Sequence, residues 1–207
     1  MPTEPSPPQP RLFVMPATVS ADEEMLLLAL RRGDRRAEAL FFDRFAIPVN
    51  RRVHRLLGHD GEHDDVVQMV FEQLLLGARR VRDASRLGEW VDAVTVNVVR
   101  KELRRRRVRR LVGFFADPPE VPGRVADPDQ TLAARRALEL LSTLPVEERL
   151  AFVLRDVDGE ELAAVAAMLG VSLATAKRRV ARGREIFTKK ARRDPALAGY
   201  AVEGRRT

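Results

Sequence analysis

The sequence predicts an all-α protein made of two small helical domains joined by a flexible linker. Apolar residues recur at the spacing of amphipathic helices through most of the 207 residues, and no segment shows the alternation of a half-buried strand. A segment with four prolines and two glycines, residues 113–128, interrupts this pattern in the middle of the chain. The length also suits two small domains.

The first domain is expected to span residues 20–110. Residues 1–19 contain six prolines and are predicted to be a disordered arm. Ser20 and Glu23 have the spacing of a capping box, which marks the start of the first helix. Helical spacing follows in residues 25–30, 37–45 and 49–57, and Pro48 should kink or end the second of these segments.

The next two predicted helices complete this domain. The turn residues 59–62 precede a helix from Asp64 to Leu76, and Ser85 is the expected cap of a helix over residues 86–110. Residues 87–99 are apolar on nearly every side, which indicates burial, and Trp90 is expected to anchor the core.

The second domain is expected to span residues 130–193, after a linker at 111–129 and before a flexible tail at 194–207. Helical patterns occupy residues 131–141, 145–155, 160–169 and 172–188. Pro145 fits the first position of its helix, where the missing N–H costs nothing. Asp158 and Glu161 repeat the capping-box spacing.

Composition excludes several classes of protein. The chain has no cysteine, so it can form neither a disulfide, a thiolate zinc site nor a cysteine nucleophile. Its apolar runs stop well short of the roughly 20 residues that a membrane span needs. The first residues lack the basic and apolar regions of a secretory signal. We therefore expect a soluble, cytoplasmic protein that does not insert into membranes.

Positive charge is concentrated in two segments. The chain has 37 Lys+Arg against 30 Asp+Glu, a formal charge of +7, and only four of the basic residues are lysines. Residues 97–110 contain eight basic residues and one acidic residue, while residues 172–193 contain nine and one. The rest of the chain is net acidic. Such basic runs must be solvated or matched by an anion, and a nucleic-acid backbone is a suitable anion.

The second basic segment has the pattern of a helix-turn-helix. Residues 160–169, a turn at Gly170 and residues 173–187 predict helix, turn and helix. One side of the second helix carries a stripe of four apolar or small residues, Ala176, Val180, Gly183 and Phe187, which can pack on the helix at 160–169. Arg178 and Arg182 project from the opposite side. This favours a DNA recognition helix, with the Ser172 hydroxyl near a backbone phosphate, over an amphipathic helix with a merely solvated face.

Two further patterns leave alternatives open. Asn97 precedes the first basic run by one turn, so its amide could contact a base edge or simply lie satisfied within the bundle. A histidine and aspartate cluster also invites a metal-site interpretation, although zinc needs three or four supported ligands. Its members are His54, His59, His63, Asp60, Asp64 and Asp65.

Three segments in order resemble the bacterial sigma-70 family, specifically its extracytoplasmic-function (ECF) group. Residues 64–71 are similar to the family's D-x-x-Q-x-V-F signature, and residues 90–105 to its W-L…N…L-R-R segment. The stretch from Leu144 to Arg184 resembles its promoter-binding helix-turn-helix. Departures occur at Val96, Lys101, Ala174 and Arg178, so the promoter sequence cannot be transferred.

The resemblance implies a protein that is not an enzyme, has no cofactor or small-molecule substrate, and gives core RNA polymerase its promoter recognition. Polymerase contacts would involve Asp64, Asp65, Gln68 and Phe71. Contacts with the minus-ten element would involve Asn97, Arg100, Lys101, Arg104 and Arg105, helped by the loop at 77–88. Contacts with the minus-thirty-five element would involve Ser172, Thr175, Lys177, Arg178, Arg179 and Arg182. The resemblance also implies an anti-sigma protein as a partner, although no residue identifies one.

Two other functions compete with this one. A stand-alone regulator would use the helix-turn-helix directly and keep the N-terminal helices for sensing or dimerisation. A metal-dependent hydrolase would use the histidine and aspartate cluster.

Overall fold

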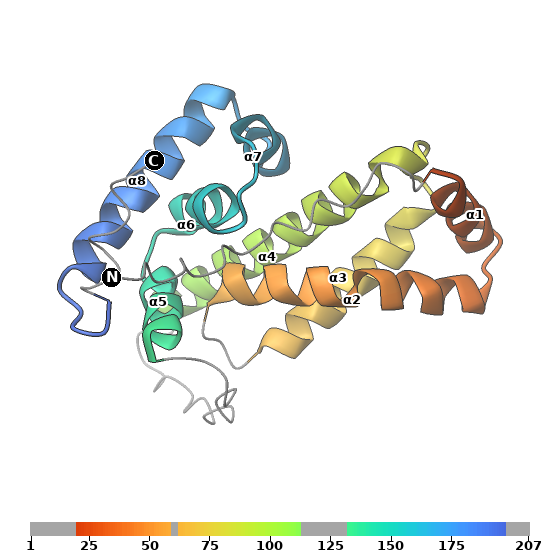
Figure 1. Cartoon of the computed structure of the whole chain (residues 1–207). Helices are drawn as coiled ribbons and strands as arrows, with labels where there is room; N and C mark the ends of the chain where they lie inside the picture. The colour runs from red at the N-terminus through yellow and green to blue at the C-terminus, as the bar shows by residue number, and fades with distance from the viewer. Residues whose placement is uncertain (1–19, 59–61, 113–131, 198–207) are drawn as a thin grey trace, which may run out of the picture.

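The computed structural model describes residues 20–58, 62–112 and 132–197, which form helices and turns without any strand (Figure 1). The predicted all-α class is therefore confirmed. The expected disordered arm, most of the expected linker and residues 198–207 of the expected tail lie outside the described residues. No helix in the described part is long and apolar enough to span a membrane.

The first group of helices contains α1 (Ser20–Arg31), α2 (Arg35–Leu57), α3 (His63–Ala78) and α4 (Leu87–Val112). A short 3₁₀ turn, Ala84–Arg86, precedes α4. Helices α2, α3 and α4 pack on one another and α1 lies across one end (Figure 1). Their core includes Phe41, Val53, Leu56 and Val70, all fully buried, and the burial of apolar surface is the main term that holds such helices together.

The α2 helix continues through Pro48 and does not end there, which was one of the two outcomes, a kink or an end, that the sequence predicted. Proline inside a helix costs about 3 kcal/mol through its lost hydrogen bond and ring clash. However, α2 buries Ala37, Phe41, Phe45 and Val49 at four-residue spacing across this position. Full burial of one large apolar side chain contributes about 1.5–3 kcal/mol. Several of them together outweigh the cost of one proline, and Pro48 itself is exposed.

The start of α4 also differs from the prediction. Asp83 caps the 3₁₀ turn, because its carboxylate accepts from the Ser85 backbone N–H at 3.0 Å and from the Ser85 hydroxyl at 2.6 Å. Ser85 is therefore the capped residue and not the cap. Trp90, one turn into α4, packs against the core as expected. A Cβ at Gly77 would lie only 2.6 Å from the Trp90 ring, so the missing side chain allows this contact.

The second group contains α5 (Leu132–Ser142), α6 (Val146–Phe152), α7 (Leu162–Leu169) and α8 (Leu173–Ala191). A π-helical turn, Val153–Val157, extends α6. Pro145 is the N-cap of α6, one position before its first helical residue. Residues 194–197, which the sequence placed in a flexible tail, form turns in which Leu197 is buried.

In neither of the two predicted capping boxes does the carboxylate cap its helix. The Glu23 carboxylate of α1 accepts from Arg44 of α2 at 2.5 Å. Asp158 pairs with Arg52 and Arg55 of α2, and α7 has Glu161 at its N-cap without a side-chain hydrogen bond. In both cases a long-range arginine holds the carboxylate.

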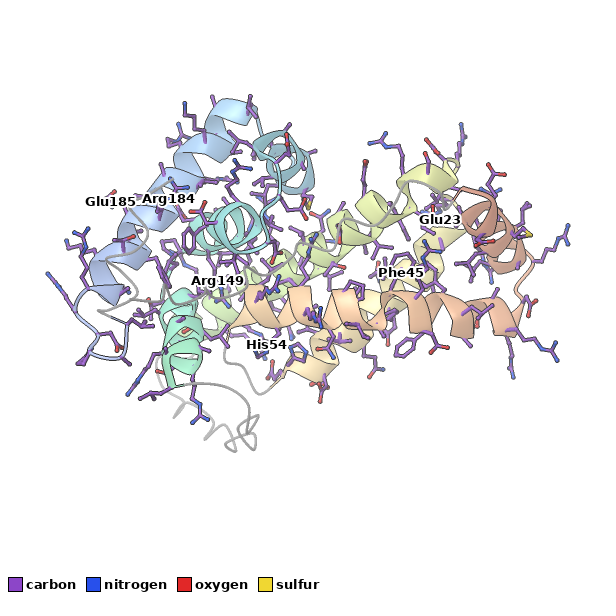
Figure 2. All side chains as sticks on the ribbon, viewed as in Figure 1. Glu23, Phe45, His54, Arg149, Arg184 and Glu185 are labelled. Atoms are coloured by element: carbon purple, nitrogen blue, oxygen red, sulfur yellow. The ribbon has the colours of Figure 1, made fainter. Side chains whose placement is uncertain are left out.

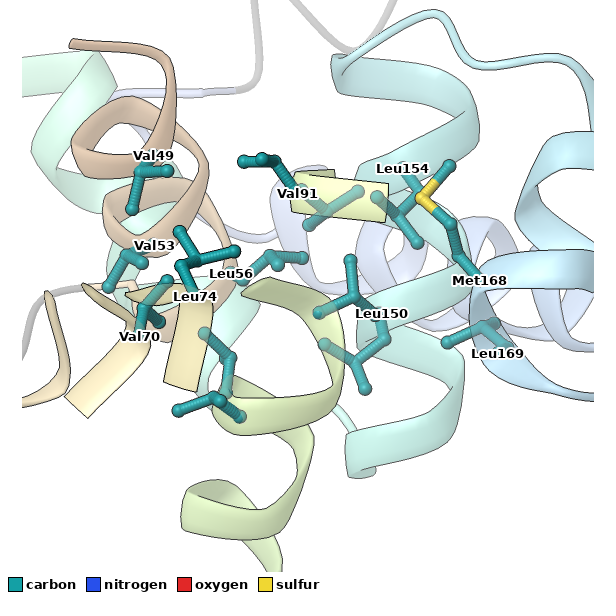
Figure 3. Close-up of a cluster of buried hydrophobic side chains, with 14 of the residues drawn as sticks. Val49, Val53, Leu56, Val70, Leu74, Val91, Leu150, Leu154, Met168 and Leu169 are labelled. Carbon is teal, nitrogen blue, oxygen red and sulfur yellow. The ribbon is translucent and has the colours of Figure 1, made fainter. Parts of the chain in front are cut away.

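The two groups of helices share a single apolar cluster. Helix α4 contacts both α6 and α7. Figure 3 shows Val53 and Leu56 of α2, Val91 of α4, and Leu150 and Leu169 from the second group within this cluster. The second group of helices therefore covers one side of α4.

Candidate nucleic-acid interface

The predicted helix-turn-helix is present as α7 and α8. Gly170 ends α7 with φ 61° and ψ 41°, a left-handed conformation that favours glycine. Its N–H and that of Val171 donate to carbonyls in the last turn of α7. Ser172 then caps α8, since its hydroxyl oxygen accepts from the Thr175 N–H at 3.3 Å and donates to the Thr175 hydroxyl. The turn thus directs the N-terminus of α8 outward.

The stripe of α8 is buried as predicted, but it packs on α6 as well as on the helix at 160–169 that the sequence predicted as its partner. Ala176, Val180 and Gly183 are buried. The Phe187 ring lies 5.1 Å from the ring of Phe152. An added Cβ at Gly183 would meet the backbone oxygen of Glu148 at 2.6 Å, so the two helices approach closely there. This contact fixes which side of α8 faces solvent.

The outward side of α8 carries three exposed basic residues between its first turns and its middle, Lys177, Arg178 and Arg182. Lys177 and Arg178 have no ion pair with another described residue. Arg182 pairs with Glu185 of the same helix at 2.7 Å, and Figure 2 labels Glu185 on α8. Such an exposed array can contact phosphates and base edges of DNA.

Arg179 lies apart from this array. Its Nη1 is 2.8 Å from Oε2 of Glu147, at the start of α6, and its side chain is largely buried. The sequence grouped Arg179 with the outward residues of α8, but the structure turns it toward α6. Thr175 is half-buried beside the Ser172 cap.

The predicted minus-ten residues lie along the C-terminal half of α4. Asn97 and Lys101 are exposed and have no hydrogen-bond partner among the described side chains. Arg100 and Arg104 are held by Glu147, with their Nη2 atoms 2.6 Å from its carboxylate oxygens. Arg100 also donates to the Leu169 carbonyl at 2.9 Å. The structure therefore joins arginines from two distant basic runs around one carboxylate.

Glu102 matches three further arginines of the same run. Its side chain is 2% exposed and accepts from Arg105 and Arg106 at 2.7–2.8 Å, with Arg109 at 3.4 Å. Hydrogen bonds from Arg105 and Arg106 lower the pKa of Glu102 to about 2, against the opposing effect of burial. Arg106 is itself buried and also contacts Glu62. The basic run at 97–110 was expected to be solvated or matched by an anion. Carboxylates of the protein itself supply part of the negative charge that matches it.

The predicted polymerase-binding residues all lie on α3, but some are exposed and one is buried. Asp64, Asp65 and Gln68 are exposed, and the Gln68 amide donates to Glu72 at 3.2 Å. Phe71 is only 6% exposed and its ring lies 4.6 Å from that of Phe42. Phe71 thus belongs to the core at this position.

The histidine cluster does not assemble a metal site in the part of the chain that the structure describes. His63 is buried, with Nε2 2.6 Å from the Asn50 amide oxygen. Its ring contacts that of His54, which Figure 2 labels on α2, at a centroid distance of 5.6 Å. His59 and Asp60 lie outside the described residues.

Sequence reasoning missed three carboxylates that organise this interface. The partnership of Glu102 has a local signal, because Arg105 and Arg106 follow at the three- and four-residue spacing of helical ion pairs. Glu147 and Asp158 pair with residues 43 to 106 positions earlier in the chain. No local pattern predicts such contacts.

Comparison with known proteins gives consistent results. Residues 134–186 match the family model described as "Sigma-70, region 4". The chain is 33% identical over 183 residues to the ECF RNA polymerase sigma factor SigM of Mycobacterium tuberculosis, with 86% of each chain covered.

Two solved structures have a similar fold. One is CnrH in complex with the cytosolic domain of CnrY, with a TM-score of 0.58, 21% identity and coverage of 83% of this chain and 98% of that chain. The other is the sigma factor RpoE in complex with the anti-sigma factor NepR from Bartonella quintana, with a TM-score of 0.52, 19% identity and coverage of 81% and 92%.

Proposed function

Because the chain belongs to the ECF group of the sigma-70 family, we propose that it binds core RNA polymerase and directs it to promoters in the cytoplasm. It carries out no catalysis itself, since the polymerase supplies the chemistry. The observation that carries this proposal is the outward basic array in the first half of α8, a helix that a glycine turn and a serine cap join to α7. That geometry suits insertion into the major groove.

The two promoter elements are assigned to two helices. The minus-thirty-five element is contacted by Lys177, Arg178 and Arg182 of α8. Ser172 and Thr175 lie near a phosphate, and Arg179 lies at the edge of the contact that is nearest to α6. Asn97 and Lys101 of α4 contact the minus-ten element, together with Arg100, Arg104 and Arg105. Linked binding to two elements raises the affinity through effective concentration once polymerase sets their separation.

The exposed face of α3 is assigned to polymerase. Asp64, Asp65 and Gln68 project from it, and the chain's acidic residues complement a basic partner surface. Phe71 supports this face from beneath, through its contact with Phe42. An anti-sigma protein is a further proposed partner, because a sigma factor of similar fold is solved with one.

The decisive experiment is run-off transcription with purified core polymerase on a library of genomic promoter fragments. We expect initiation from a subset of promoters that depends on the added protein. Absence of both core binding and initiation would refute the proposal. A footprint on DNA without polymerase would instead support the stand-alone regulator.

Matched variants test the residue assignments. Arg182→Ala should weaken recognition of the upstream element about ten-fold while leaving core binding intact, because a base or phosphate contact contributes about 1–3 kcal/mol. Arg184→Ala removes the same charge from a different side of α8, where Arg184 pairs with Asp156, and should have a smaller effect. Equal losses would refute the role of Arg182.

For the polymerase face, Asp65→Asn should weaken core binding in a pulldown. Glu161→Gln serves as its control, because Glu161 is an exposed acid at the start of α7. Equal binding by the two variants would place the polymerase contact elsewhere.

A further inference from the structure

Glu147 joins arginines from both basic segments of the chain. Its Oε2 is 2.6 Å from Nη2 of Arg100 and 2.8 Å from Nη1 of Arg179, and its Oε1 is 2.6 Å from Nη2 of Arg104. Arg100 adds a second hydrogen bond from Nε, at 2.9 Å. We name Glu147 with these three arginines the Glu147 clamp.

The Glu147 carboxylate is charged in this setting. Burial acts to raise the pKa of Glu147, but the hydrogen bonds from Arg100 and Arg104 prevail and hold the pKa below its ordinary value. A carboxylate that binds guanidinium groups in this way offers the same kind of acceptor as a phosphate. The clamp therefore forms ion pairs with three arginines that our proposed function assigns to promoter DNA.

A second set of ion pairs ties the two groups of helices together elsewhere. Arg52 of α2 contacts Glu160 at 2.6 Å and Asp158 at 3.4 Å, both in the segment between α6 and α7. Arg55 contacts Asp158 at 2.6 Å. Asp158 is 3% exposed, so these pairs exclude most water. We name Arg52, Arg55, Asp158 and Glu160 the Arg52 cluster.

Apolar packing adds to both sets of ion pairs. Leu150 and Leu154 of the α6 segment and Met168 and Leu169 of α7 lie in the same buried cluster as Val91 of α4 (Figure 3). The ion pairs of Glu147 place α6 on the side of α4 that presents Arg100 and Arg104. In this arrangement the Arg100 side chain is only 17% exposed, so a DNA backbone cannot reach it without displacing α6, whereas Arg104 is 57% exposed and would have to exchange Glu147 for a phosphate.

We propose that the free protein is held closed by the Glu147 clamp, in which the carboxylate takes the place of promoter phosphates at Arg100, Arg104 and Arg179. This inference rests on the proposed function, because it concerns the regulation of the same DNA-binding residues. Release of one carboxylate frees arginines on α4 and α8 together, which adds Arg100, Arg104 and Arg179 in one step to the basic residues of these helices that are already exposed. The Arg52 cluster and the apolar contacts stabilise the closed arrangement and limit how often it opens.

The experiment compares Glu147→Gln with Glu148→Gln in the full chain. Glutamine has the shape of glutamate without its charge, and Glu148 is the next residue in the same first turn of α6. Both variants change the net charge equally, so non-specific attraction to DNA rises equally. Only Glu147→Gln weakens the clamp.

Two measurements monitor the opening of the closed arrangement. The chain has no cysteine, so Gln73→Cys on α3 and Lys189→Cys on α8, both exposed, can carry a donor and an acceptor dye in every variant. We expect Glu147→Gln to lower the transfer efficiency relative to wild type and Glu148→Gln. Its affinity for a short labelled DNA duplex of arbitrary sequence should rise roughly three- to thirty-fold, as loss of charged hydrogen bonds predicts.

A second matched pair keeps the test valid if Glu147→Gln fails to fold. Glu160→Gln weakens the Arg52 cluster, whereas the adjacent Glu161→Gln changes an exposed acid at the N-cap of α7. Glu160→Gln should lower the transfer efficiency and Glu161→Gln should not. Equal transfer efficiencies within the folded pairs, or opening without a gain in DNA affinity, would overturn the inference.

These measurements require neither polymerase nor a promoter, so they are separable from the test of the proposed function. A chain that opens and gains DNA affinity but never supports initiation would support the closed arrangement and refute the sigma-factor function. If the protein supports initiation but Glu147→Gln and Glu160→Gln leave the transfer efficiency unchanged, the sigma-factor function would be supported and the closed arrangement refuted.

Discussion

Replacing Gly183 with alanine should destabilise the contact between α6 and α8. An ideal Cβ at Gly183 would lie 2.6 Å from the Glu148 carbonyl oxygen and 2.8 Å from Cβ of Phe152. Neither atom belongs to the flexible end of a side chain, so relief requires movement of one helix relative to the other. Since Gly183 lies in the middle of α8, such a movement would also shift the basic array.

The magnitude follows from two opposing effects. Alanine is more favourable than glycine in a helix interior by about 1 kcal/mol. Overpacking a tight contact costs about 1–3 kcal/mol, and the backbone oxygen places this case at the upper end. We expect a net loss of about 1–2 kcal/mol in the free energy of unfolding. For a chain of this size that corresponds to a fall of roughly 2–8 °C in Tm.

Chemical and thermal denaturation followed by circular dichroism measure this loss. Gly88→Ala is the matched control, because a Cβ at Gly88 of α4 would have no atom within 4 Å. That variant should be unchanged or more stable by up to about 1 kcal/mol. If Gly183→Ala were as stable as Gly88→Ala, the close approach of α6 and α8 would be refuted.

Three further predictions concern buried groups. Glu102→Gln should cost on the order of 2–4 kcal/mol at pH 7, because it removes the charge that pairs with buried Arg106. Since the folded pKa of Glu102 is about 2, wild-type stability should fall as pH drops from about 4.5 toward 2, and denaturation of the variant should lack this fall. Burial raises the pKa of Asp92 beside Arg52 to about 6, so lowering pH from 7.5 to 5.5 should favour the closed arrangement. Asp92→Asn should flatten that change in transfer efficiency. Phe71→Ala should lose about 3–5 kcal/mol in denaturation, while Gln68→Ala should stay within about 0.5 kcal/mol and affect only polymerase pulldown.

Local periodicity predicted the elements of this fold well because helices are local structures. The stripe of Ala176, Val180 and Gly183 predicted which side of α8 is buried, and the structure confirms it. The glycine and serine between α7 and α8 predicted the turn for the same reason. Their conformations depend on hydrogen bonds to residues at most four positions away.

Predictions failed where a distant partner decided the outcome. Pro48 looks like a helix breaker in isolation, but packing on both sides keeps α2 continuous. Glu23 and Asp158 both have capping-box spacing, yet Arg44 and Arg52 bind their carboxylates. A charge-assisted hydrogen bond with a half-buried arginine is stronger than a hydrogen bond at an exposed helix end. Sequence spacing alone does not reveal which of the two will form.

Long-range ion pairs also change what the basic segments imply for DNA binding. In the closed arrangement, Arg100, Arg104 and Arg179 share the single negative charge of Glu147, so they displace fewer counterions from DNA than three free arginines would. The logarithm of DNA affinity falls with the logarithm of salt concentration by about 0.9 per phosphate contacted. Opening by Glu147→Gln should therefore steepen that slope by up to about 2–3. Glu148→Gln should keep the wild-type slope. Equal slopes would mean that the three arginines contact DNA in neither state, or in both.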